Sequence, residues 1–312
     1  MTTILVTEFI DEDALRAFPA DWTVRYEPTL VDDRGALLVA APTVDAVIVR
    51  NRTQVDAGLL EAAPRLRAVG RLGVGLDNID VPACEARGIA VLPATGANAA
   101  SVAEYVIGVA LSLVRGAFGA ADAIASGAWP RAELGRGSEI GGRTLGLLGA
   151  GLIAREVAVR GAALGMRVIA HDPFVHADAS VWGTMERVEF DALIERSDLL
   201  SLHVPLTDGT RDLVDRAVLG RMKPSAVLVN TARGGIVDET ALIAALRDGR
   251  LGGAALDVFA DEPPNEPNRF ADVPNLILTP HIAGVTREAN ERVSALTVKN
   301  VMRALGESEG RT

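Results

Sequence analysis

The sequence has little cysteine, few aromatic residues and no long apolar run, and each shortage excludes a class of protein. Cys84 is the only cysteine in 312 residues, so no disulfide can form within the chain, which fits a reducing cytoplasm. Aromatic residues make up 4% of the chain and leave few rings for stacking on nucleic-acid bases. The most apolar long stretch, residues 105–114, is too short to span a bilayer, and the first ten residues do not resemble a signal peptide.

Basic charge is also in deficit. The formal net charge is −10, which argues against a surface for nucleic acid or for an anionic membrane. The remaining composition is that of an ordinary globular protein, with 49% hydrophobic and 23% charged residues. A chain of 312 residues favours two domains.

A glycine motif stands at the centre of the chain, between a predicted strand and a predicted helix. Residues 145–148 form a short apolar run, and residues 152–164 are typical of a helix. Between them the pattern Gly149-x-Gly151-x-x-Ala154 matches the dinucleotide-binding fingerprint, which permits alanine at its last position. Gly149 allows a tight turn, Gly151 leaves room for a pyrophosphate, and the helix N-terminus offers free N–H groups to it. An ordinary turn is the alternative interpretation.

The next predicted strand strengthens the dinucleotide interpretation. Residues 166–170 are apolar and lead to His171-Asp172-Pro173. Asp172 follows Gly149 by about 20 residues, the spacing of the acidic residue that binds the adenine ribose hydroxyls. A carboxylate there repels a 2′-phosphate, so we expect NAD rather than NADP, although a helix cap would also explain an aspartate.

Short apolar runs alternate with helical stretches along the chain, which predicts parallel sheets. The first block resembles a small doubly wound domain, and a long helix over residues 98–126 leads to a polar segment, residues 127–142, and the glycine motif. Six strands are expected from Leu145 onward, the number in a complete dinucleotide-binding domain, and a helix over residues 285–305 closes the chain. The expected strands are 3–7, 23–26, 46–49, 66–69 and 89–91, then 145–148, 166–170, 198–202, 226–230, 254–258 and 276–278.

Several loops after strands carry reactive polar residues, at the sheet edge where ligands bind in such folds. Arg233 can offer a fork of donors to a carboxylate, or form a surface ion pair. Glu262 precedes two prolines, and His281 can exchange a proton near neutral pH. His203 is a rival proton carrier or a cofactor-wall residue. The glycine-rich loop at residues 70–80 is either an anion-binding nest or a flexible connector.

Four motifs together resemble the D-isomer-specific 2-hydroxyacid dehydrogenases, in particular the phosphoglycerate dehydrogenase branch. They are Asn230-Thr-Ala-Arg-Gly-Gly-Ile-Val-Asp238, Asp257-Val-Phe-x-x-Glu262-Pro, Pro280-His-Ile-Ala-Gly284 and Ser101-Val-Ala-Glu-Tyr105. The similarity covers about residues 45–301, and the first forty residues match in pattern only. The resemblance implies two doubly wound parallel-sheet domains, with a Rossmann NAD-binding domain (99–283) inserted into a flavodoxin-like substrate-binding domain (1–98 and 284–312). It also implies an active site in the cleft between the domains and a homodimer formed through the cofactor domain.

The resemblance also implies roles for individual residues. Arg233 would hold the substrate carboxylate, His281 would exchange the proton of the C2 oxygen, Glu262 would hydrogen-bond His281, and Asp257 would hold the nicotinamide carboxamide. We expect no metal. NAD would contact Gly149, Gly151, Leu152, Ile153, Asp172, His203, Val204, Pro205, Thr231, Ala232, Asp257, His281 and Gly284. The substrate would contact Arg50, Asn51, Arg52, Gly73, Val74, Gly75, Arg233 and His281.

Two departures from the family pattern bear on regulation and substrate. The chain ends soon after its last predicted helix, so feedback through a carboxy-terminal regulatory domain is not expected. Arg52 follows Arg50 where relatives more often have a small residue, and it either binds a second substrate anion or pairs with a nearby acidic residue. The first interpretation favours a dianionic 2-hydroxy acid such as 3-sulfolactate, 3-phosphoglycerate or a malate-like acid.

Other functions remain open on the same fold. A glyoxylate or hydroxypyruvate reductase would use the same residues, although many prefer NADP. A formate dehydrogenase pairs its histidine with glutamine, whereas Glu262 favours a hydroxy acid. An NAD(H)-sensing corepressor-like protein can keep the arginine, glutamate and histidine, and the acidic charge argues against it.

Overall fold

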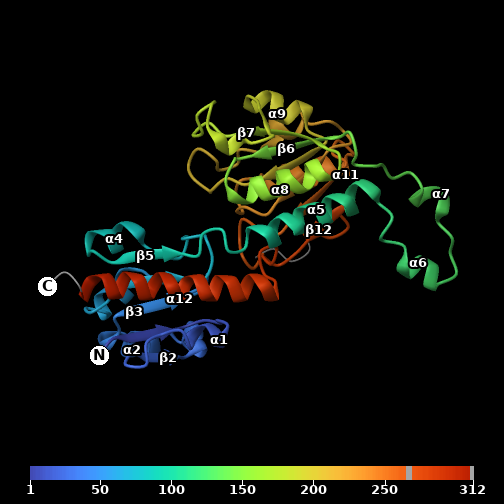
Figure 1. Cartoon of the computed structure of the whole chain (residues 1–312). Helices are drawn as coiled ribbons and strands as arrows, with labels where there is room; N and C mark the ends of the chain where they lie inside the picture. The colour runs from blue at the N-terminus through green and yellow to red at the C-terminus, as the bar shows by residue number, and fades with distance from the viewer. Residues whose placement is uncertain (265–268, 310–312) are drawn as a thin grey trace. The chain divides into compact units, whose positions relative to one another are not determined.

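The computed structural model describes residues 1–264 and 269–309 of the chain. They form two compact units, which we call unit 1 (Met1–Asn98 with Val285–Thr312) and unit 2 (Ala99–Gly284) (Figure 1). Unit 1 therefore contains both ends of the chain, and unit 2 is one continuous segment. Among the described residues, no helix has the length and apolar character needed to cross a bilayer.

Unit 1 is built on a five-stranded parallel sheet with the strand order β2-β1-β3-β4-β5, the doubly wound order seen in flavodoxin. One face packs under α2 and α3, and the other face packs under α1 and α12, so apolar clusters cover both sides. The strands are β1 (Thr3–Val6), β2 (Thr23–Tyr26), β3 (Ala46–Val49), β4 (Ala68–Arg71) and β5 (Ala90–Pro93). The helices are α1 (Glu12–Leu15), η1 (Pro28–Asp32), α2 (Arg34–Ala40), η2 (Ala41–Thr43), α3 (Ala57–Ala62), α4 (Val81–Ala86) and α12 (Arg287–Glu309).

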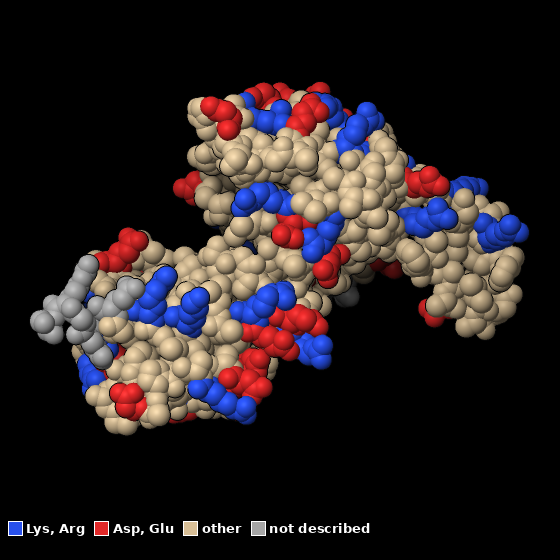
Figure 2. All heavy atoms as spheres, viewed as in Figure 1, with Lys and Arg blue, Asp and Glu red and all other residues tan. Residues whose placement is uncertain are grey.

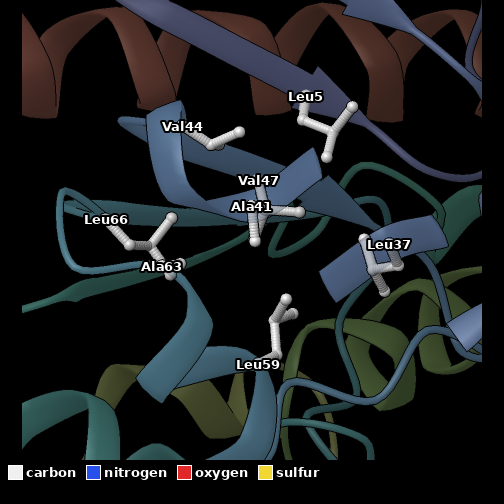
Figure 3. A pocket seen from close by; sticks show the side chains of 8 residues that line it. All are labelled: Leu5, Leu37, Ala41, Val44, Val47, Leu59, Ala63 and Leu66. Atoms are coloured by element: carbon white, nitrogen blue, oxygen red, sulfur yellow. The ribbon is translucent and has the colours of Figure 1, made fainter. Parts of the chain in front are cut away.

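A small pocket lies in the core of unit 1, between the sheet and the helices α2 and α3. Figure 3 shows the side chains from these elements pointing toward one another. Every lining residue is apolar, so the pocket offers no hydrogen bond or charge to an acid and is a packing space rather than a substrate site. The lining residues are Leu5, Leu37, Ala41, Val44, Val47, Leu59, Ala63 and Leu66.

Unit 2 is built on a seven-stranded parallel sheet with the strand order β12-β11-β10-β9-β6-β7-β8. This is the Rossmann order, in which the first strand lies between the second and fourth, extended by one strand at the far edge. The strands are β6 (Thr144–Leu148), β7 (Arg167–His171), β8 (Glu186–Arg187), β9 (Leu199–Leu202), β10 (Val227–Asn230), β11 (Gly253–Leu256) and β12 (Leu276–Leu278). The fold class predicted from the sequence is confirmed, but six strands were expected. The missed strand, β8, consists of two exposed charged residues and gives no apolar run.

Helices cover both faces of the unit 2 sheet. Those packed on one face include α5 and α8, and the other face carries α9, α10 and α11. The bounds are α5 (Ala99–Arg115), α6 (Ala121–Ala125), α7 (Arg131–Leu134), α8 (Leu152–Ala163), η3 (Ser180–Trp182), α9 (Phe190–Arg196), α10 (Arg216–Leu219) and α11 (Glu239–Arg247).

The long helix expected over residues 98–126 is wrong in extent. Helix α5 ends at Arg115, and the chain continues through a separate short helix, α6. Gly116 ends α5 because it adopts φ +62°, a left-handed conformation that commonly terminates helices. The apolar pattern continues past this glycine, which is why periodicity alone extended the helix.

Candidate active site

The glycine motif forms a tight turn at the end of β6, in residues 149–151. Gly149 adopts φ +98°, and a Cβ atom there would lie 2.6 Å from the carbonyl oxygen of His203. Only glycine fits this position without moving the backbone of the neighbouring strand. Gly151 is the N-cap of α8, and a Cβ atom there would meet nothing within 4 Å. The turn is thus closed on the strand side and open in front of the helix N-terminus, which suits a bound phosphate group.

Asp172 supports this turn from the neighbouring strand. It follows β7, and its Oδ2 accepts a hydrogen bond of 3.0 Å from the N–H group of Ala150. Its Oδ1 accepts another from Phe174 N at 3.0 Å. The carboxylate is therefore held at the end of β7, next to the glycine turn, where an adenine ribose would be bound.

Two further residues predicted to line a cofactor have distinctive environments. The Thr231 hydroxyl, after β10, is buried and has no hydrogen-bond partner among the described residues. A buried polar group without a partner is costly, and a bound ligand would satisfy it. His203, after β9, hydrogen-bonds to Ser201 Oγ at 3.0 Å through Nε2, and desolvation lowers the pKa of its ring to about 3. A ring that stays neutral at ordinary pH does not suit a general acid, which favours the cofactor-wall interpretation over the rival proton carrier.

The loop that carries Arg233 is folded by the side chain at the end of β10. Asn230 accepts a hydrogen bond from Ala232 N at 3.0 Å and donates one to the carbonyl of Arg233 at 2.9 Å. Gly234 packs directly on the loop after β11, because a Cβ atom there would lie 1.7 Å from Phe259 O. This close approach brings the Arg233 backbone next to the segment that carries Glu262.

Glu262 and His281 form a hydrogen-bonded pair, with Oε2 of the glutamate 2.7 Å from Nδ1 of the histidine. The other glutamate oxygen accepts a hydrogen bond from Phe259 N at 3.0 Å. Burial opposes the charged form of Glu262, but these two bonds, together with the charges of His281 and Arg233, outweigh it and hold the pKa of this carboxyl below its ordinary value. Glu262 is therefore a carboxylate at neutral pH, and its hydrogen bond to Nδ1 orients the imidazole ring of His281.

The loop of residues 279–284, here called the His281 loop, is held from beneath by Asp257. This buried carboxylate accepts hydrogen bonds of 2.8 Å from both Ile282 N and Ala283 N, and one of 2.5 Å from Thr279 Oγ1. The backbone N–H of His281 donates to the carbonyl of Asp257 at 2.8 Å. His281 itself adopts φ +56°, a conformation that costs a non-glycine residue about 1–2 kcal/mol and persists where its surroundings hold it.

In unit 1, a second buried carboxylate holds the loop of residues 50–53, here called the Arg52 loop. Glu8 follows β1 and accepts hydrogen bonds from Arg50 N at 2.8 Å, Thr53 N at 2.9 Å and Arg52 N at 3.3 Å. The Asn78 side chain donates to the carbonyls of Arg50 and Thr53, at 3.1 and 2.6 Å. Backbone groups of this loop are thus engaged within unit 1, the Thr53 side chain is buried, and the side chains of Asn51 and Arg52 are exposed.

The two arginines of the Arg52 loop differ in environment. Arg50 donates to Asn290 Oδ1 at 2.6 Å and lies over the ring of Phe9, and burial lowers its pKa despite the opposing charge of Glu8. Arg52 is exposed and forms an ion pair with Asp32, so the ion-pair interpretation of this residue describes the structure as it stands. An ion pair between two exposed side chains is worth about 0–1 kcal/mol, so Arg52 can exchange Asp32 for another anion.

The remaining predicted substrate residues lie at the end of β4 and beside Arg52. Gly73 adopts φ +141°, the neighbouring Val74 is exposed, and Gly75 is half-buried. Asn51 is exposed between the two arginines. No group of acidic, histidine and cysteine side chains that could bind a metal occurs within residues 1–264 and 269–309.

Sequence reasoning missed the residues that hold these loops. It assigned no role to Glu8, Asn78 or Thr279. Each makes its contact with a residue far away in the sequence, 42 residues for Glu8 and Arg50 and 22 for Thr279 and Asp257, so no local pattern marks it. The one available signal was position, because Glu8 and Asp257 both follow a strand end.

Comparison with known proteins identifies relatives that align with nearly the whole chain. Residues 107–283 match the family "D-isomer specific 2-hydroxyacid dehydrogenase, NAD binding domain". The chain is 56% identical over 307 residues to an (S)-sulfolactate dehydrogenase from Chromohalobacter salexigens, covering 98% of this chain and 99% of that protein. The alignment extends beyond the residues 45–301 expected from the motifs.

A longer relative and a solved structure also align with nearly the whole chain. A D-3-phosphoglycerate dehydrogenase from Archaeoglobus fulgidus is 38% identical over 96% of this chain, which spans 56% of that protein's length. The crystal structure of a D-lactate dehydrogenase from Aquifex aeolicus, complexed with NAD and lactic acid, is 27% identical with a TM-score of 0.83, covering 99% of this chain and 96% of that one. The chain therefore belongs to the D-isomer specific 2-hydroxyacid dehydrogenases and is an NAD-dependent oxidoreductase.

Proposed function

We propose that this enzyme interconverts a small 2-hydroxy acid bearing a second anionic group with its 2-keto acid, and that 3-sulfolactate is its substrate. The observation that carries the proposal is the 56% identity to an (S)-sulfolactate dehydrogenase over nearly the full length of both chains. A second arginine on the exposed Arg52 loop supports it, since a sulfonate and a carboxylate on one small molecule need two cationic partners.

In the proposed mechanism, Arg233 binds the substrate carboxylate through its guanidinium donors. His281 removes the hydroxyl proton during oxidation and returns it to the C2 oxygen during reduction. Glu262 stays ionised beside it and stabilises the protonated ring at 2.7 Å. Bound NAD supplies the acceptor for the hydride that leaves C2.

The residues that would hold NAD fit that role. The glycine turn is open in front of α8, Asp172 is fixed beside it, and the buried Thr231 hydroxyl lacks a partner among the described residues. We assign the cofactor to unit 2 and the remaining substrate contacts to the Arg52 loop and to Gly73, Val74 and Gly75 of unit 1. The carboxamide contact of Asp257 is part of the same proposal.

The test is a spectrophotometric panel at 340 nm, run in both directions with NAD and NADP. It covers lactate, glycerate, malate, 3-phosphoglycerate and both enantiomers of 3-sulfolactate. We expect one enantiomer of 3-sulfolactate with NAD to have the highest kcat/KM. Preference for a monoanionic acid or for glyoxylate would overturn the substrate assignment and keep the enzyme class.

Arg52→Ala sharpens this test. We expect the KM for 3-sulfolactate to rise roughly tenfold, the effect of about one charge-assisted contact, while the KM for lactate stays within twofold. Arg34→Ala is the matched control, because Arg34 forms a comparable exposed ion pair with Asp56 in the same unit. Equal effects of both variants would show that Arg52 does not contact the substrate.

We also propose that the enzyme is a cytoplasmic homodimer formed through unit 2, without nucleic-acid or membrane partners. The segment around α6 and α7 exposes three large apolar side chains, Phe118, Ile124 and Trp129, which is unusual without a partner surface. On the face drawn in Figure 2, acidic and basic side chains are interspersed. Light scattering of Trp129→Glu tests the dimer: we expect a monomer, and an unchanged mass would exclude this segment.

A further inference from the structure

Three side chains of unit 2 form a row of hydrogen bonds beneath the His281 loop. The hydroxyl of Tyr105, on α5, lies 2.6 Å from Thr279 Oγ1, and Thr279 Oγ1 lies 2.5 Å from Asp257 Oδ1. Tyr105 and Thr279 are separated by 174 residues, so the row joins the first helix of unit 2 to its last loop. Nothing in the mechanism described so far uses Tyr105 or the Thr279 hydroxyl.

The direction of the protons in this row follows from the chemistry of its end. An ionised carboxylate can only accept, so Thr279 must donate its single proton to Asp257. The Thr279 oxygen can then only accept from its other neighbour, and Tyr105 must donate to it. Burial raises the pKa of Tyr105 above its ordinary value and outweighs the hydrogen bond to Thr279, which lowers it. The charge of Asp257 raises this pKa further, so the donating proton stays in place.

The far end of the row determines the backbone around His281. Asp257 Oδ1 is shared between Thr279 and Ile282 N, and Oδ2 accepts from Ala283 N. These bonds fix the two residues that follow His281, whose own φ is +56°. The near end is rigid as well, because Ala103 and Val106 beside Tyr105 are fully buried in the core of unit 2.

We propose that Tyr105 and Thr279 are positioning residues that act through Asp257 to hold the His281 loop in its catalytic conformation. This rests on the proposed role of His281 as the proton carrier. Without the Thr279 hydroxyl, the Asp257 carboxylate loses one of the three hydrogen bonds that it accepts and can rotate away from Ile282 N and Ala283 N. Without the Tyr105 hydroxyl, Thr279 Oγ1 loses one of its two hydrogen bonds, so its side chain is held less firmly against Asp257.

Kinetics test the proposal through a split between kcat and KM. We expect kcat to fall about tenfold in Thr279→Val and about three- to fivefold in Tyr105→Phe, while KM for the best 2-hydroxy acid changes less than threefold. Thr279→Ser keeps the hydroxyl and should retain most of the wild-type kcat. An equal loss in the serine and valine variants would show that packing matters rather than the hydrogen bond, and would overturn the proposal.

The double variant tests whether Tyr105 acts through Thr279 or whether the two residues have independent structural effects. If Tyr105 acts only through Thr279, adding Tyr105→Phe to Thr279→Val causes no further loss of kcat. Losses that multiply would contradict the proposal. Tyr26→Phe is the matched control, since Tyr26 is the only other tyrosine in the chain and lies in β2 of unit 1, and it should leave kcat unchanged.

A readout that needs no substrate keeps this inference distinct from the proposed function. Hydrogen exchange in the peptide that contains residues 281–284 reports the N–H groups bound to Asp257. We expect it to accelerate at least fivefold in Thr279→Val and Tyr105→Phe and to stay unchanged in Tyr26→Phe. Unchanged exchange in the first two variants would overturn this inference, whereas faster exchange in an enzyme that turns over no 2-hydroxy acid would refute only the proposed function.

Discussion

The His281 loop of unit 2 and the Arg52 loop of unit 1 are held by the same device. In each case a buried carboxylate follows one strand and accepts hydrogen bonds from backbone N–H groups of the loop after the neighbouring strand. Asp257 follows β11 and holds the loop after β12, and Glu8 follows β1 and holds the loop after β3. Asp172 repeats the arrangement more weakly, with one bond from β7 to the turn after β6.

The two loops differ in which of their groups remain available to bind a ligand. Asp257 fixes a strained backbone whose central side chain, His281, is paired with Glu262 and half-exposed. Glu8 accepts hydrogen bonds from three backbone N–H groups of its loop, which leaves the exposed side chains of Asn51 and Arg52 available for recognition. The same arrangement therefore presents the proposed acid–base group in unit 2 and an exposed charged surface in unit 1. If the proposed roles hold, removing the carboxylate should affect kcat in unit 2 and KM in unit 1.

The largest effect is expected from Asp257→Asn. The amide nitrogen would face a backbone N–H, donor against donor, on at least one side of the loop, so the His281 conformation would lose its support. We expect kcat to fall roughly 100-fold, at the lower end of what a general acid–base group contributes. Steady-state kinetics and the Kd for NADH measure it. Asp45→Asn is the control, because Asp45 is also buried and paired but stands before β3 in unit 1. An equal loss of activity in both variants would contradict a specific role.

Glu262→Gln should have the next largest effect, with a characteristic pH dependence. The amide removes the carboxylate that pairs with His281 and orients its ring, so reduction should slow about tenfold to 100-fold. The wild-type pairing has its own limit. Because the pKa of Glu262 lies below its ordinary value of 4.5, its stabilising contribution is complete above that value and is lost as the pH falls through the lowered pKa. Glu262→Gln has no carboxylate to protonate, so a loss of activity at low pH that is unchanged from the wild type would contradict the pairing.

The comparison of the two loops also shows which parts of this site could be predicted from the sequence. The glycine turn and the strand ends give local signals, since Gly149 needs a positive φ and apolar runs mark buried strands. The support beneath the loops gives none, because Glu8 contacts Arg50 across 42 residues and Tyr105 contacts Thr279 across 174. The sequence shows that Arg52 departs from the family pattern, but only the structure identifies Asp32 as the partner in its ion pair. Function was readable from motifs, whereas the pre-organisation of the site depends on contacts set by the sheet order.

Glu8→Gln is expected to act on binding rather than on turnover. One amide oxygen can still accept from Arg50 N and Thr53 N, but the amide nitrogen cannot accept from Arg52 N. We expect the KM for 3-sulfolactate to rise about three- to fivefold with kcat unchanged. The substitution also removes a negative charge, which alone would lower the KM for an anion. A rise in KM therefore shows that loop geometry dominates, and a fall would show that charge does.

The smallest effect is expected from Asp32→Asn, which releases Arg52 from its ion pair. An exposed pair is worth about 0.5 kcal/mol, so a freed Arg52 should lower the KM for 3-sulfolactate roughly twofold. The effect should disappear in Arg52→Ala, where no arginine remains to be released, and it should weaken at high salt because both side chains are exposed. Asp56→Asn releases Arg34 in the same way and serves as the control. If Asp32→Asn lowers the KM for lactate equally, the change reflects the loss of one negative charge from unit 1. Arg52 would then not distinguish a dianionic acid from a monoanionic one.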